Sequence, residues 1–131
     1  MSLPDPEKSV LTRKGRVGIY DRVLVDYLTS EWTAETSGYV QSRRAHGHGC
    51  TERHCMQMRH LIRNNVQPYF GNALVGDVDD IELDEFFIFL KLEKKLSASS
   101  INHVINAIKK PLDFAVQKGV LDFNPMEHIE R

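Results

Sequence analysis

Apolar residues recur every three or four positions through most of this chain, and that spacing restricts it to helices packed on a shared core. The longest stripe consists of Ile101, Val104, Ile105, Ile108, Leu112 and Ala115. Such residues lie on one face of an α-helix, so we expect one long helix here, capped by Ser97 or Ser99. Pro111 lies inside the stripe and predicts a kink or a break, because proline has no N–H for the carbonyl four residues earlier.

Shorter stripes of the same spacing predict further helices. One is expected roughly from Tyr20 to Trp32. Another follows Thr51, which is a good N-cap residue, and is closed by Pro68 and Gly71. Between these two helices, Tyr39 and Val40 fit either an extension of the first helix or the start of a short one, and Gly47 and Gly49 predict a loop.

The aromatic run at residues 86–90 fits either a buried strand or a third helix. Its length and the surrounding charges favour a helix that ends near Lys94. A short strand or turn is expected around Leu74–Val78, and Gly119 and Asn124-Pro125 are expected to end the long helix and the bundle. The whole pattern predicts an all-α bundle of four or five helices with little or no sheet.

The chain has 131 residues, which is room for one domain. Residues 1–18 carry prolines and glycines without an apolar period and are expected to form a flexible leader. We find neither a signal peptide nor an apolar run near the roughly 20 residues that span a bilayer. Two cysteines are too few for a disulfide scaffold and indicate a reducing compartment, so we expect a cytoplasmic location.

The net charge of -1 argues at first against a nucleic-acid binder, but the charges are unevenly placed. Residues 41–66 hold five arginines against one glutamate, and residues 94–118 hold five lysines against one aspartate. Between them, residues 77–93 hold seven acidic residues against one lysine. Because DNA responds to the local field of one face, two basic segments that fold together would suit it.

Short motifs in the second half follow one another in a characteristic order. They are Pro68-Tyr69-Phe70-Gly71, then Leu74, Val78 and Ile81, then Leu96-Ser97-Ala98-Ser99-Ser100-Ile101-Asn102, and finally Phe114-Ala115-Val116-Gln117-Lys118-Gly119-Val120 with Asn124-Pro125. Over roughly residues 20–128 this series resembles the N-terminal core-binding domain of tyrosine recombinases, the phage integrase family. Two departures are Ser100, where the family commonly has threonine, and Pro111 within the long helix.

The resemblance implies a SAM-like helical bundle, residues 19–128, that binds double-stranded DNA at core recombination sites as half of a clamp. The other half in the family is a catalytic domain with a tyrosine nucleophile, and residues 129–131 would begin the linker to it. The chain itself is therefore not expected to be an enzyme, whereas its full-length parent would break and rejoin DNA. Other recombinase protomers on DNA are the expected protein partners, and neither a membrane nor a small-molecule substrate is expected.

Candidate DNA-contacting residues come from the two basic segments. Arginine, lysine and asparagine side chains reach phosphates or base edges when a helix enters the major groove, and a helix N-terminus favours a phosphate. The candidates are Arg43, Arg44, Arg59, His60, Arg63, Lys94, Lys95, Ser97, Ser99, Asn102, His103, Asn106 and Lys110.

Other site motifs are weaker. The two His-x-x-Arg matches, at residues 60–63 and 128–131, have no tyrosine in the required position after them and are read as coincidence. The cluster His46, His48, Cys50, His54 and Cys55 lacks the paired spacing of structural zinc sites, and Cys55 falls on an apolar stripe. No catalytic residue, metal ligand or cofactor is therefore predicted.

Two other interpretations remain open. One is a helical protein–protein interaction or oligomerisation module of a DNA-associated regulator, which the acidic third helix favours. The other is a small zinc-dependent module, which rests only on the histidine and cysteine cluster. A reading frame that continues past Arg131 into an Arg…His-x-x-Arg…Tyr region would decide for the recombinase.

Overall fold

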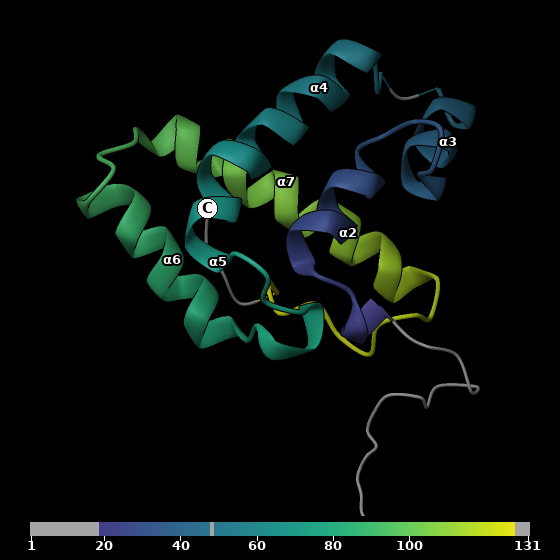
Figure 1. Cartoon of the computed structure of the whole chain (residues 1–131). Helices are drawn as coiled ribbons and strands as arrows, with labels where there is room; N and C mark the ends of the chain where they lie inside the picture. The colour runs from purple at the N-terminus through teal and green to yellow at the C-terminus, as the bar shows by residue number, and fades with distance from the viewer. Residues whose placement is uncertain (1–18, 48, 128–131) are drawn as a thin grey trace, which may run out of the picture.

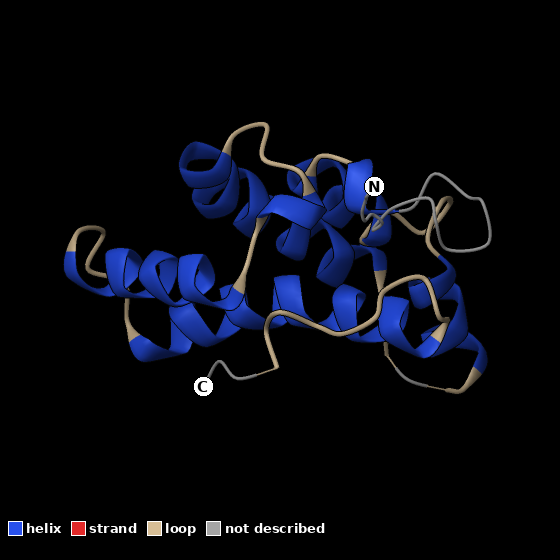
Figure 2. Cartoon of the chain, turned by 90° about the horizontal axis from the view of Figure 1, so that it is seen from below, coloured by secondary structure: helices blue, strands red, loops and turns tan. Residues whose placement is uncertain are grey.

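The computed structural model describes residues 19–47 and 49–127, and within these ranges the regular elements are helices (Figures 1 and 2). In chain order they are the 3-10 turn η2 (Ile19–Asp21), α2 (Leu24–Glu31), α3 (Gly38–Ala45), α4 (Glu52–Leu61), the π-helical turn η3 (Ile62–Val66), α5 (Gln67–Phe70), the 3-10 turn η4 (Val75–Asp77), α6 (Asp80–Leu92) and α7 (Ala98–Gln117). The predicted all-α bundle is confirmed. The leader at residues 1–18 and the segment 128–131 lie outside the described residues.

Four helices begin at a side-chain cap. Ser37, Thr51, Asp79 and Ser97 each accept a hydrogen bond from the backbone N–H three residues later, at distances of 2.8–3.1 Å. Each such cap typically stabilises a helix by about 1 kcal/mol. The predicted cap at Thr51 is confirmed, and of the two serines considered for the long helix, Ser97 is the cap.

The first predicted helix begins later than expected. Val23 is extended and forms an isolated bridge with Leu74, so α2 starts only at Leu24. The pairing is fixed by two backbone bonds, from Leu24 N to Ala73 O at 2.9 Å and from Val75 N to Arg22 O at 2.8 Å. Long-range pairing therefore overrides the local helical pattern there, and the short strand or turn expected around Leu74–Val78 is this bridge followed by η4.

Pro68 does not close the second predicted helix. The α4, η3 and α5 segments follow one another without a gap as far as Phe70, and the left-handed Gly71 (φ 56°) ends them. Proline at position 68 has no N–H for the carbonyl of Asn64. The ammonium of Lys94 donates to that carbonyl instead, at 3.0 Å.

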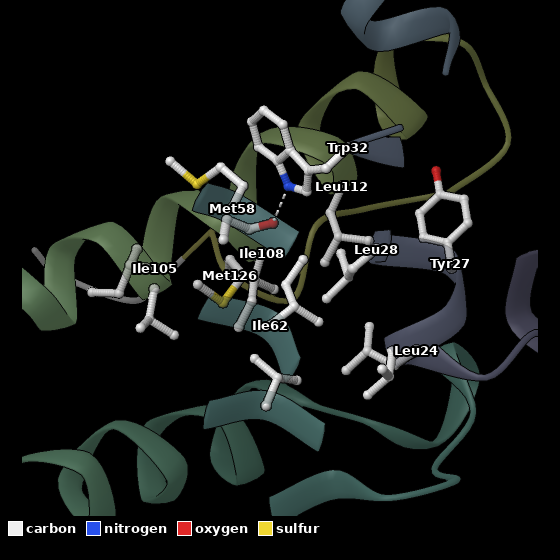
Figure 3. Packing of buried hydrophobic residues seen from close by; sticks show 14 of the residues in the cluster. Leu24, Tyr27, Leu28, Trp32, Met58, Ile62, Ile105, Ile108, Leu112 and Met126 are labelled. Atoms are coloured by element: carbon white, nitrogen blue, oxygen red, sulfur yellow. Dashed lines mark hydrogen bonds between the residues drawn. The ribbon is translucent and has the colours of Figure 1, made fainter. Parts of the chain in front are cut away.

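Pro111 does not break α7, which is helical from Ala98 to Gln117. The indole N–H of Trp32 donates to the carbonyl of Ala107 at 2.8 Å, which supplies the bond that Pro111 cannot make (Figure 3). The predicted end of this helix at Gly119 is confirmed by its left-handed backbone (φ 79°).

The core lies around α7, which packs against α2, α4, η3 and α6. Trp32, Leu28, Ile62, Ile108 and Met126 are completely buried (Figure 3). Met126 belongs to the segment after α7, which folds back along the bundle (Figure 1). That segment is fixed by Asn124, whose side chain bonds Asp113, the carbonyl of Lys109 and the N–H of Met126.

Candidate nucleic-acid interface

The two basic segments of the sequence meet where α3, α4 and α7 come together. His54 on α4 reports their proximity: its pKa is lowered by burial, and then by the positive charges of Arg43 on α3 and of Lys110 and His103 on α7. Residues 67 positions apart in the chain thus share one electrostatic environment. The acidic helix α6 lies on the other side of the molecule from α3 (Figure 1).

A first cavity, of about 450 Å³, lies between α3 and α7. It is lined by Tyr39, Ser42, Arg43, His46, Lys110, Asp113, Phe114 and Gln117. The guanidinium of Arg43 lies 5.9 Å from the centre of the Tyr39 ring, which itself packs edge-on against Trp32 and Phe114. The core aromatics therefore support the cationic wall of this cavity, and burial raises the pKa of Tyr39, which keeps its hydroxyl neutral.

A second cavity, of about 430 Å³, lies between α4 and α7. It is lined by His54, Met56, Gln57, Met58, His60, Leu61, Asn64 and His103. His54 also packs edge-on against Trp32, with ring centroids 5.5 Å apart. Histidines from two helices thus line a cavity with a largely apolar floor.

Acidic side chains on these three helices are few and paired. The helix α3 has none, α4 has only Glu52, and α7 has only Asp113. Arg59 forms an ion pair with Glu52 at 3.0 Å, and Lys109 forms one with Asp113 at 3.0 Å. The other carboxylate oxygen of Asp113 accepts a hydrogen bond from the side chain of Asn124 at 2.7 Å. The face formed by α3, α4 and α7, which we call the basic face, therefore keeps an excess of positive charge.

Some of the predicted basic contact residues make hydrogen bonds within the fold. Arg59 donates to the Trp32 carbonyl at 2.7 Å as well as to Glu52, and its side chain is only 16% exposed. Arg44 donates to the carbonyl of Cys50 at 2.7 Å, and Lys94 donates to Asn64 and Asn65. In the structure these side chains hold loops and helix ends in place, and whether they also contact DNA stays a prediction.

The structure brings together only part of the predicted set. Arg43, His60, His103 and Lys110 line the two cavities. Arg63 is exposed on η3, and Asn102 and Asn106 are half-buried on α7. Lys95, Ser97 and Ser99 are exposed near the start of α7, and Ser99 lies about 16 Å along that helix from Lys110 at 1.5 Å per residue.

Several cavity residues were not among the predicted contacts. Ser42, His46, His54, Gln57 and Asn64 belong to this group. Their helical spacing is a usable signal, because His54, Gln57, Leu61 and Asn64 recur every three or four residues on one face of the helix. His103, Lys110 and Gln117 similarly recur every seven residues on α7.

The cysteine and histidine cluster has a structural explanation where it is described. Cys50 and Cys55 are buried free thiols with their sulfurs 4.0 Å apart, and burial raises the pKa of Cys55 to about 11. Among residues 19–47 and 49–127, no three histidine, cysteine or acidic side chains gather as a metal site. His48 lies outside the described residues.

Comparison with known families decides the assignment. The model of the phage integrase SAM-like domain matches residues 37–130. The chain belongs to this family. The match begins at the cap of α3 and covers every helix of the basic face, so both cavities lie within the SAM-like domain. No curated protein and no solved structure matches the chain.

Aromatic packing joins α5 to α6. Tyr69, nine residues after His60, packs its ring against Phe70, Phe86 and Phe89, with centroids 4.9–5.2 Å apart. It therefore belongs to an aromatic cluster between α5 and α6. None of the helices in the described ranges has the length and apolarity to cross a membrane.

Proposed function

We propose that this chain is the DNA-binding domain of a site-specific tyrosine recombinase and binds double-stranded DNA at core recombination sites. The observation that carries the proposal is the basic face of a phage integrase SAM-like domain, on which both acidic side chains are already paired. A duplex that approaches α3, α4 and α7 meets Arg43 and Lys110 with no unpaired carboxylate from these helices. The full-length parent would supply the chemistry of DNA breakage and rejoining from a separate catalytic domain in the cytoplasm, and other protomers would bind beside it on the DNA.

Phosphate contact supplies most of the affinity in this proposal. Each phosphate that a protein cation neutralises makes log K fall by about 0.9 for each tenfold rise in salt. Arg43 and Lys110 line one cavity from two helices, so they are the residues that we assign to the DNA backbone. Arg43→Gln with Lys110→Gln removes two charges from that cavity.

Fluorescence anisotropy with a labelled duplex of 30 base pairs, across a range of salt concentrations, tests the proposal. The wild-type chain should bind with a salt-dependent affinity. For the Arg43→Gln/Lys110→Gln variant, the slope of log K against the logarithm of the salt concentration should be smaller in magnitude by about 2. Arg22→Gln with Lys91→Gln is the matched control, because it removes the same two residue types from α6 and from the segment before α2. Equal slopes for the two double variants would contradict the assignment.

A second candidate is a protein–protein interaction module, which the surface of α6 favours. Ile81, Ile88 and Leu92 are 50–65% exposed on that helix, between acidic residues. This face repels DNA and offers apolar area to a protein. Sedimentation of the chain alone at several concentrations tests the case in which the partner is a second copy.

A further inference from the structure

The two cavities of the basic face differ in chemistry. The α3–α7 cavity contains Arg43, Lys110 and Asp113, whereas the residues that line the α4–α7 cavity include no lysine, arginine, aspartate or glutamate. A phosphate diester carries a full negative charge and is bound best by a cation. The α4–α7 cavity is therefore suited to a neutral part of the DNA.

The polar groups of the α4–α7 cavity match the edge of a base. Gln57 and Asn64 have exposed carboxamides, each with a donor and an acceptor. One carboxamide can make two hydrogen bonds to a single adenine, as acceptor to its N6 amine and as donor to its N7. They are seven residues apart on the α4–η3 helix, or about 10 Å at 1.5 Å per residue. That distance is about three base-pair steps at 3.4 Å each.

The apolar side chains of the same cavity match the other half of an A·T pair. Met56, which is 45% exposed, lines the cavity together with Met58 and Leu61. The methyl group of thymine is the apolar feature of the major groove. A methionine is flexible and polarisable, so its side chain adapts to such a group.

His54 contributes a neutral imidazole to the wall of this cavity. The pKa of His54 is lowered by burial and by the charges of Arg43, Lys110 and His103, so its imidazole is neutral near pH 7. The nearby carboxylate of Glu52, on the same helix, is held by Arg59. A neutral imidazole has one donor and one acceptor, which again fits a base edge.

We propose that the α4–α7 cavity reads the major-groove edge of A·T base pairs through Gln57, Asn64 and Met56, while the α3–α7 cavity holds the phosphate backbone. This assignment rests on the proposed DNA-binding function. It separates two tasks that mutation can test independently, because phosphate contacts set the salt dependence and base contacts set the sequence preference.

Selection from a random double-stranded DNA library tests the first part. The wild-type chain should enrich duplexes with A·T pairs at two positions about three steps apart. The Gln57→Ala/Asn64→Ala variant should lose this enrichment and bind the selected duplex about 30-fold more weakly or worse, with an unchanged salt slope, because two base contacts are removed. Gln67→Ala with Asn72→Ala is the matched control, since it removes the same exposed residue types outside the cavity.

Uracil substitution tests the apolar part without any change to the protein. Replacing thymine by uracil in the selected duplex removes only the methyl groups. Affinity of the wild-type chain should fall about fourfold for each buried methyl, as expected for about 0.8 kcal/mol. The Met56→Ala variant should distinguish the two duplexes less.

The outcomes separate this inference from the proposed function. Salt-dependent binding without sequence preference, a preference for G·C pairs, or enrichment that survives in the Gln57→Ala/Asn64→Ala variant would overturn the inference and leave DNA binding intact. Equal affinity for thymine and uracil duplexes would overturn the role of Met56. Failure of the folded wild-type chain, checked by its helical circular dichroism, to bind any duplex would overturn both.

Discussion

The indole N–H of Trp32 donates a hydrogen bond of 2.8 Å to the carbonyl of Ala107, which is the carbonyl that Pro111 leaves without a backbone donor. In the same way, the ammonium of Lys94 donates a hydrogen bond to the carbonyl of Asn64, four residues before Pro68. In both helices a proline removes one bond of the backbone ladder, and a side chain from another part of the fold restores it.

Trp32→Phe should lower the free energy of unfolding by about 2–4 kcal/mol. The variant leaves the Ala107 carbonyl buried without a donor, and it also removes part of a fully buried side chain. In a Pro111→Ala background, the new backbone N–H can bond Ala107, so the same change should cost about 1 kcal/mol less. Urea denaturation of the four proteins measures the difference, and an equal cost in both backgrounds would contradict the explanation.

Lys94→Met should lower the free energy of unfolding by about 1 kcal/mol, because it removes the donors to Asn64 and Asn65 while it keeps a long side chain. Lys91→Met is the control on the exposed side of α6. The cost of Lys94→Met should shrink when Pro68 is replaced by alanine, since the helix can then bond Asn64 itself. Thermal unfolding gives both values, and a control that is as destabilised as Lys94→Met would refute the prediction.

Protonation of His54 should oppose folding. Its pKa is lower in the folded chain than in the unfolded chain, so the unfolded chain takes up the proton first as the pH falls. This contribution to stability is complete above the unfolded pKa of about 6.5 and is lost below it. NMR titration of the imidazole should show the low pKa, and Arg43→Gln/Lys110→Gln should raise it. A value that the double variant leaves unchanged would show that burial alone is responsible.

Asn124→Ala should detach the segment after α7. The buried side chain makes three bonds, to Asp113, to the Lys109 carbonyl and to the N–H of Met126. We expect a loss of about 2–3 kcal/mol and faster hydrogen exchange at Met126. Phe123→Ala, at a neighbouring exposed side chain, is the control, and exchange that is equally fast in both variants would contradict the role of Asn124.

Much of the fold was predictable from the sequence because its signals are local. Thr51 and Ser97 cap their helices through bonds to backbone three residues away, and Gly119 adopts the left-handed backbone that ends α7. Pro68 and Pro111 misled the prediction for the opposite reason. Their missing bonds are supplied by Lys94 and Trp32, which are far away in sequence.

The candidate site was predictable only in part. Arg43 and Lys110 were identified from their charge, and the structure brings them to one cavity. Sequence spacing does not show that Arg59 donates to the carbonyl of Trp32, because that contact depends on how the end of α2 packs against α4. Gln57 and Asn64 carry no charge and draw attention only once the cavity between α4 and α7 is seen.

The two prolines also bear on how the domain folds. A peptide of residues 98–117 alone has no donor for the Ala107 carbonyl other than water, so its helix should fray on either side of Pro111. The Ala107 carbonyl of α7 gains its donor only when Trp32 packs against that helix. The Asn64 carbonyl of the α4–α5 segment likewise gains the bond from Lys94 only when the end of α6 packs beside it. Secondary and tertiary structure are thus coupled, and the bundle is expected to unfold in one cooperative transition rather than helix by helix.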